Sequence, residues 1–223
     1  MISSGLLLAV GAGAGWAADG FTSDIAQAVR GGTVGLDFRY RFEGVDQDGI
    51  SKDAEASTLR SRITATSGSL YGFTALGEVD NVTVIGSDHY NSTVNGKSQY
   101  PVVADPKGTE VNQVYLKYTA DAANGIYGRQ RINYSNQRFV GGVGWRQNEQ
   151  TFDGFRANWQ ALDSVNLDYS YTYRVHRVFG PDDGTFPAEW DGDNHFLYLD
   201  WKVAEGHNIG AFGYYIDVDS QHS

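Results

Sequence analysis

The chain has 223 residues, no cysteine and a formal net charge of −10. This length allows one domain with a sizeable interior. The lack of cysteine excludes disulfides and thiolate chemistry, and the acidic balance argues against a nucleic-acid partner. Aromatic residues make up 13% of the chain, with 28 glycines but only 4 prolines. This composition is typical of strands joined by turns.

The N-terminus, MISSGLLLAVGAGAGWAA, has features of a secretory signal peptide. A short apolar stretch at 6–10 is followed by small residues and by a small-x-small site at 15–17, although the start has no Lys or Arg. We therefore predict a signal peptide over residues 1–18 and a short periplasmic helix or lead-in over 19–32. The apolar stretch is too short to cross a bilayer as a helix.

Apolar and charged residues alternate strictly in residues 33–43, TVGLDFRYRFE, which predicts a strand with one apolar and one charged face. Eleven residues rise roughly 35 Å, and a tilt near 45° reduces this to about 25 Å, the height of the apolar band of an outer-membrane barrel. The same alternation recurs at 57–66, 70–80, 110–119, 125–135, 151–160, 165–177, 195–203 and 208–218. We therefore predict nine strands.

The alternation also predicts which side chains share a face. Residues expected on the outer face include Ile126, Ile132, Tyr134, Val175, Phe212, Tyr214 and Ile216, whereas Tyr215 is expected on the inner face.

The predicted connections alternate in length. Long connections at 44–56, 81–109, 136–150 and 178–194 alternate with short ones at 67–69, 120–124, 161–164 and 204–207. Outer-membrane barrels have long extracellular loops and short periplasmic turns. We therefore predict an all-β fold, a transmembrane antiparallel up-and-down β-barrel over residues 33–223 in the Gram-negative outer membrane. A soluble all-β sandwich is the alternative, but its loops need not alternate and its exposed face would not carry so many arginines.

Nine strands also place the end of the chain on the extracellular side, if the first strand runs outward. Single-chain bacterial barrels have an even number of strands, so we expect these residues to form about half of a larger barrel.

Residues 127–157 resemble the alginate-export family of outer-membrane proteins. The motifs that carry the resemblance are VNQVYLKY at 111–118, GRQRI at 128–132, NQRFVG at 136–141 and GWRQNEQTFD at 144–153. The resemblance implies a barrel of about eighteen strands with an aqueous lumen. It also implies passive transport or export of anionic solutes or polysaccharide. The expected partners are outer-membrane lipid and the barrel assembly machinery, and no cofactor is expected.

Many arginines fall on predicted inner-face positions. Arginines in a narrow lumen create a positive field, and their planar guanidinium groups suit carboxylates. The candidate solute contacts are Arg39, Arg41, Arg60, Arg62, Arg129, Arg131, Arg146, Arg156, Arg174, Tyr115 and Tyr198. The alternative is that these arginines pair with inner-face acids and brace the wall, and we expect both roles. The segment 136–150 is expected to fold inward as a constriction.

A small-barrel enzyme of the protease or lipase type is the alternative function. Asp88 and His89 lie together in a predicted extracellular loop, but a catalytic site would need a serine or a second acid that converges on His89. The histidines show no metal-ligand spacing. We therefore predict a channel and no catalytic residue or metal ligand.

Overall fold

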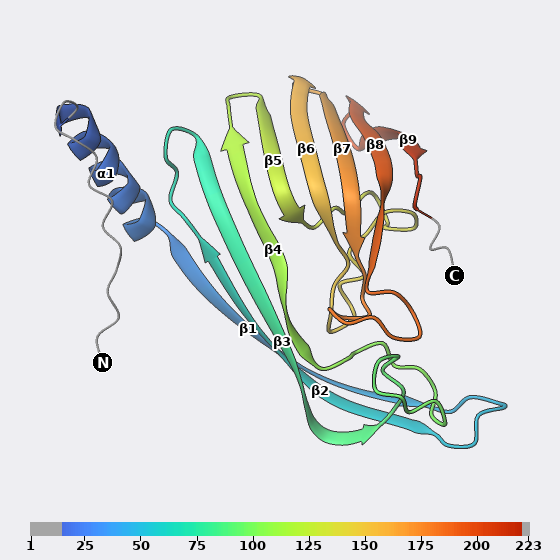
Figure 1. Ribbon diagram of the computed structural model, residues 1–223. Coiled ribbons are helices and arrows are strands. Elements are labelled where there is room, and N and C mark those ends of the chain that lie inside the picture. Colours follow the sequence, from blue (N-terminus) through green and yellow to red (C-terminus); the bar gives the residue numbers. More distant parts are fainter. Residues whose placement is uncertain (1–14, 220–223) are drawn as a thin grey trace, which may run out of the picture.

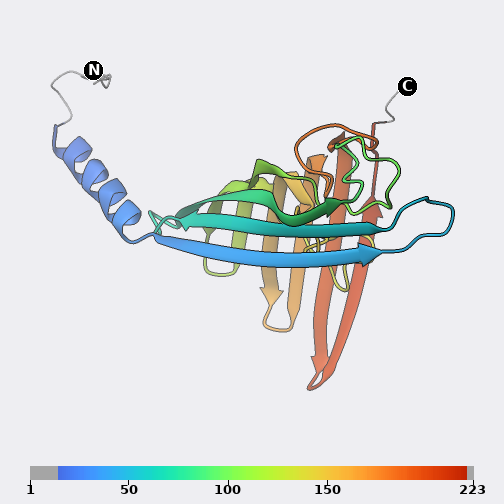
Figure 2. The ribbon, with the colours of Figure 1, turned by 90° about the horizontal axis from the view of Figure 1, so that it is seen from below.

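A computed structural model describes residues 15–219. Helix α1 (Gly15–Arg30) precedes one antiparallel sheet whose nine strands lie side by side in chain order. The strands are β1 (Thr33–Val45), β2 (Ala54–Thr66), β3 (Phe73–His89), β4 (Gly108–Thr119), β5 (Ala123–Gln130), β6 (Thr151–Leu162), β7 (Val165–His176), β8 (Glu189–Ala204) and β9 (His207–Tyr215). The sheet curves, and its strand direction turns progressively from β1 to β9 (Figures 1 and 2). The predicted all-β up-and-down architecture and its nine strands are confirmed.

Most of the predicted signal peptide lies outside the described residues. Residues 1–14 of the predicted signal peptide are not described, and residues 15–18 belong to α1. The predicted lead-in contains the rest of the helix, which ends just before Gly31. Among the described residues, no helix is long and apolar enough to cross a membrane.

The connections alternate in length as predicted. Short turns at 67–72, 120–122, 163–164 and 205–206 lie at one end of the sheet, and the long connections 46–53, 90–107, 131–150 and 177–188 follow the other strand ends (Figure 1). In an outer-membrane barrel the end with the short turns is the periplasmic one. Strand β5 ends five residues before the predicted boundary of 135, because residues 131–150 leave the sheet.

Cross-strand pairing separates an outer apolar face from an inner polar face. Leu36 pairs with Ile63, which pairs with Val79, and all three side chains are exposed. The next row on the opposite face pairs Asp37 with Arg62 and Arg62 with Asp80. Because directly paired residues share a face, the apolar row belongs to the surface that faces lipid in a barrel.

Some of the predicted faces in β5–β7 are wrong. Arg129 pairs with the outward Val114 and with Asp153, which pairs with Arg174. Both arginines therefore lie on the outer face, and their predicted place in the lumen is wrong. The register shift between Asp153 and Gly154 is the physical reason for Arg174.

Other predicted outward residues are on the inner side. Ile126 pairs with the inward Arg156. Val175 pairs with Phe152, and both are buried. Ile132 and Tyr134 are buried in the connection that leaves the sheet.

The predicted faces of β9 are reversed. Phe212 pairs with Tyr198 and Tyr214 with Phe196, so both are inward, whereas Tyr215 pairs with the outward His195. Ile216 lies beyond the end of the strand.

A buried apolar cluster, which we call the apolar core, lies on the inner side of β6–β9. It joins the start of the 131–150 connection to the sheet and consists of Ile132, Tyr134, Val140, Phe152, Val175 and Phe196.

Candidate functional site

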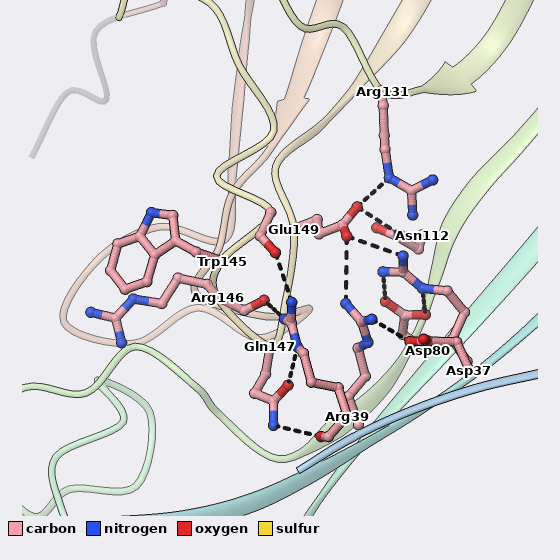
Figure 3. Close-up of polar contacts among 12 residues, drawn as sticks. Asp37, Arg39, Asp80, Asn112, Arg131, Trp145, Arg146, Gln147 and Glu149 are labelled. Atoms are coloured by element: carbon pink, nitrogen blue, oxygen red, sulfur yellow. Dashed lines mark hydrogen bonds and ion pairs between the residues drawn. The ribbon is translucent and has the colours of Figure 1, made fainter. Parts of the chain in front are cut away.

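The connection between β5 and β6, which we call the inner loop (residues 131–150), lies against the inner face of the sheet, as predicted for 136–150. Its first part packs in the apolar core. Its last part reaches β1 and β2, where the buried Gln147 side chain donates to Thr58 Oγ1 at 2.9 Å and accepts from Arg39 Nε at 3.1 Å (Figure 3). One loop therefore connects the two sides of the curved sheet.

Glu149 is the centre of the deep cluster, which we define as Arg60, Arg62, Arg131, Asp37, Glu78, Asp80 and Glu149. The Glu149 carboxylate accepts from Arg62 Nη1 at 3.0 Å, from Arg60 Nη1 at 3.4 Å and from Arg131 Nε (Figure 3). Burial raises the pKa of Glu149, but the hydrogen bonds and charges of Arg131 and Arg62 outweigh it and hold that pKa below its ordinary value. Glu149 is therefore ionised and fixes the end of the inner loop.

The wall residues of the deep cluster are also paired. Arg62 donates from Nε and Nη2 to the two oxygens of Asp80, each at 2.6 Å. Glu78 accepts from Thr64 at 2.6 Å and from Asn112 at 2.8 Å, and it also binds Arg131. The bidentate pair of Arg62 and Asp80 has a specific geometry.

At the other end of the site, the Trp145 cluster consists of Trp145, Arg39, Arg41, Arg146, Glu43 and Asp105. Trp145 is 61% exposed. The guanidinium carbon of Arg146 lies 4.2 Å from the ring centroid and that of Arg41 lies 5.1 Å from it, as in cation–π contacts. Trp145 therefore combines an exposed aromatic side chain with two cations that contact its ring.

The carboxylates of the Trp145 cluster hold these arginines. Glu43 binds Arg146 Nη1 at 3.0 Å and also Arg41. Asp105 lies 3.4 Å from Arg41 Nε and accepts the backbone N–H of Gln147 at 3.0 Å. Burial raises the pKa of the Asp105 carboxyl.

Arg39 differs from its neighbours in its partners. It donates to Gln147, to the carbonyl of Gly144 at 2.7 Å and to the carbonyl of Arg146, and none of the ion pairs among residues 15–219 includes it.

Charge is balanced over the whole site but is unevenly distributed. The deep cluster has three arginines and four carboxylates, a net charge of 3 − 4 = −1. The Trp145 cluster has three arginines and two carboxylates, a net charge of 3 − 2 = +1. The excess positive charge therefore lies beside the exposed indole.

The remaining predicted contacts are dispersed. Arg156 is inward but binds Asp168 at 2.7 Å. Tyr198 stacks on Tyr134 with 5.6 Å between ring centroids, and Tyr115 is half-buried on the inner face of β4.

On the outer face, Arg129 binds Asp153 at 2.9 Å and Arg174 binds Asp191 at 2.6 Å. The site thus gathers Arg39, Arg41, Arg60, Arg62, Arg131 and Arg146, and it adds Glu149 and Asp105, which sequence reasoning missed.

The residues of the alternative enzyme site are not arranged as a catalytic triad. Ser87 Oγ lies 3.3 Å from His89 Nδ1, but Glu55 bonds to the serine at 3.1 Å instead of orienting the histidine. Asp88 is paired with Lys97. Among residues 15–219, no group of three or more acidic, histidine or cysteine residues could hold a metal ion.

Residues 32–223 match the family described as Alginate export. The chain belongs to this family. No curated protein matches it. The family and the fold place it in the Gram-negative outer membrane, as predicted.

Solved outer-membrane structures show the same fold as this alginate export family member. OccD3 (OpdP) of Pseudomonas aeruginosa is 14% identical with a TM-score of 0.59, and the match covers 84% of this chain and 41% of that one. OpdK of Pseudomonas aeruginosa with vanillate is 14% identical with a TM-score of 0.61, over 84% and 50% of the two chains. OccAB1 of Acinetobacter baumannii is 13% identical with a TM-score of 0.63, over 88% and 47%. The chain therefore spans half or less of the length of these proteins, and its sheet corresponds to part of their barrel wall.

Proposed function

We propose that this protein is a channel through which anionic solutes or polysaccharide cross the outer membrane, with the inner loop as its constriction. The observation that carries the proposal is Trp145, which is largely exposed on a loop folded against the inner face and whose ring contacts the guanidinium groups of Arg41 and Arg146. An indole face suits a flat or cyclic ring, and the guanidinium groups suit a carboxylate. This combination matches a uronate unit or an aromatic carboxylate.

Two further observations support an anionic solute. Arginines outnumber carboxylates in the Trp145 cluster, where Arg39 has only neutral partners. The similar OpdK structure was solved with vanillate, an aromatic carboxylate. The pairing of the other arginines means that selectivity depends on these few groups and not on a general excess of charge along the wall.

The test is single-channel recording of the full-length protein in planar bilayers. With a KCl gradient, we expect the sign of the reversal potential to show anion preference. We also expect alginate oligomers to interrupt the current more than neutral dextran oligomers of equal length do. A preference for cations, or no conductance, would contradict the proposal.

Two variants test whether the Trp145 cluster causes the anion preference and the block by alginate oligomers. Trp145→Ala is expected to shorten the blocking events of alginate oligomers, and Arg39→Gln to weaken anion preference. Lys52→Gln removes one positive charge from the 46–53 connection and serves as the control. An equal change in the control would mean that long-range charge, and not the Trp145 cluster, determines selectivity.

A further inference from the structure

Helix α1 carries an apolar stripe that is exposed. Phe21, Ile25 and Val29 are four residues apart, so they lie on one side of the helix. Their exposed fractions are 53%, 39% and 71%. Ser23, Gln27 and Arg30 lie on the opposite side, so the helix is amphipathic. Such a stripe needs an apolar environment to cover it.

Two contacts fix the rotation of the helix about its axis. Tyr71 donates to the Asp24 carboxylate, and Gly68 N donates to the carbonyl of Ala28 at 2.8 Å. Asp24, Gln27 and Ala28 therefore face the β2–β3 turn, where they line a small pocket with residues 68–71. None of these contacts with the turn involves Phe21, Ile25 or Val29.

The stripe continues the outer face of the barrel. Val29 lines one shallow groove together with Val34 of β1, Ala65 of β2, Ala75 of β3 and Val114 of β4. These four residues form a row of direct or neighbouring cross-strand pairs on the apolar face. Because that face contacts lipid in an outer-membrane barrel, Val29 lies at the periplasmic border of the lipid-facing surface.

We propose that α1 lies in the periplasmic surface of the outer membrane and inserts Phe21, Ile25 and Val29 among the lipids of the inner leaflet. The occupant of the exposed stripe is therefore a phospholipid surface. An amphipathic helix with one apolar and one polar side can bind at such an interface. The helix then anchors the chain directly before β1. The proposal rests on the position of the barrel in the membrane and is independent of which solute crosses it.

Site-directed spin labelling tests the proposal, because residues 1–223 contain no cysteine that would compete with a single introduced one for the label. The variants I25C and Q27C of the full-length protein are labelled with a nitroxide in phosphatidylethanolamine–phosphatidylglycerol liposomes. Power saturation then compares access of oxygen, which concentrates in lipid, with access of a water-soluble nickel chelate. L36C on the outer face of β1 is the lipid reference, and D48C in the 46–53 connection is the water reference.

We expect the ratio of oxygen to nickel accessibility to be high at position 25, close to that of L36C, and low at position 27, close to that of D48C. A low ratio at both positions would place the helix in the periplasm and overturn the proposal. Low access of both reagents at position 25 would also overturn it, because protein would then cover the stripe. A protein without conductance can still give the expected ratios, so failure of the proposed channel function is distinguishable from failure of the proposal about α1.

Discussion

The two parts of the inner loop are held against the sheet by different kinds of contact. Near its start, Ile132 and Val140 are buried beside Phe152, Val175 and Phe196. Near its end, Glu149 is held by three arginines, and Gln147 by hydrogen bonds to β1 and β2. The apolar contacts do not depend on protonation, whereas the ion pairs exist only while the carboxylates are charged.

The two kinds of contact therefore have different roles: one attaches the inner loop to the sheet, and the other positions the end of the loop. Apolar burial stabilises without directional requirements, so the apolar core holds the start of the loop to the wall. Buried ion pairs lose most of their Coulomb energy to desolvation, but an unpaired member is costly. The deep cluster therefore favours one arrangement of residues 145–149 over its alternatives, and this arrangement determines where the Trp145 ring lies.

The largest effect is expected for Glu149→Gln, which removes the charge shared by Arg60, Arg62 and Arg131. Loss of one partner of a buried ion pair costs about 3–5 kcal/mol. We expect a lower unfolding midpoint of the full-length protein in urea, and a noisier single-channel current as the loop end is released. Glu205→Gln in the exposed β8–β9 turn is the matched control. Equal midpoints for the two variants would show that the deep cluster does not fix the loop.

On the apolar side, Ile132→Ala is expected to cost about 2–5 kcal/mol, because Ile132 is fully buried. Ile132→Val should cost about 0.5–1.5 kcal/mol if packing is the cause. The urea midpoints of both variants measure this gradation. Anion preference should stay unchanged, since no charge is altered. A change in selectivity as large as that of Arg39→Gln would contradict the different roles of the apolar start and the polar end of the inner loop.

Local patterns were sufficient to predict the strands but not all their faces. The alternation in β1 and β2 is unambiguous because every second residue is charged or polar, and the structure confirms those faces. In β9 aromatic residues occupy both sides, as in Phe212, Tyr214 and Tyr215, so only the pairing with β8 decides the face. Arg174 was assigned wrongly because a bulge changes the register without a sequence signal.

The candidate site could also be predicted only in part, because local patterns reveal some of its residues and long-range contacts decide the others. Arg39, Arg41, Arg60 and Arg62 follow from strand periodicity, which is local. Glu149 and Asp105, which pair with Arg60, Arg62 and Arg41, lie on two separate connections. Sequence patterns contain no rule for where such segments converge. The only available signal for Glu149 was its place in the GWRQNEQTFD motif.

A fall in pH should weaken the ion pairs at the end of the inner loop but not the apolar contacts at its start. The pKa of Glu149 is lowered in the folded protein, so its contribution to stability is fully present above its ordinary pKa, about 4.3. It is lost as the pH falls through the lower folded value. The difference in urea midpoint between wild type and Glu149→Gln should therefore stay constant from pH 7 to about 5 and narrow at lower pH. The corresponding difference for Ile132→Ala should not change, and a parallel decrease in both would indicate general acid unfolding.

The smallest effect is expected for Asp105→Asn. Burial raises the pKa of Asp105, so the charged carboxylate is less favourable in the folded protein than in the unfolded chain. Asparagine is neutral, and its oxygen can still accept the N–H of Gln147, so the change at neutral pH should stay within about 1 kcal/mol. The sign of the pH dependence is opposite to that of Glu149. As the pH rises through the raised pKa, ionisation of Asp105 destabilises the wild type but not the variant, so the urea midpoint of the variant should rise relative to wild type. A loss as large as that of Glu149→Gln would mean that the Asp105 charge, through Arg41 and Arg146, positions the loop as strongly as the deep cluster does.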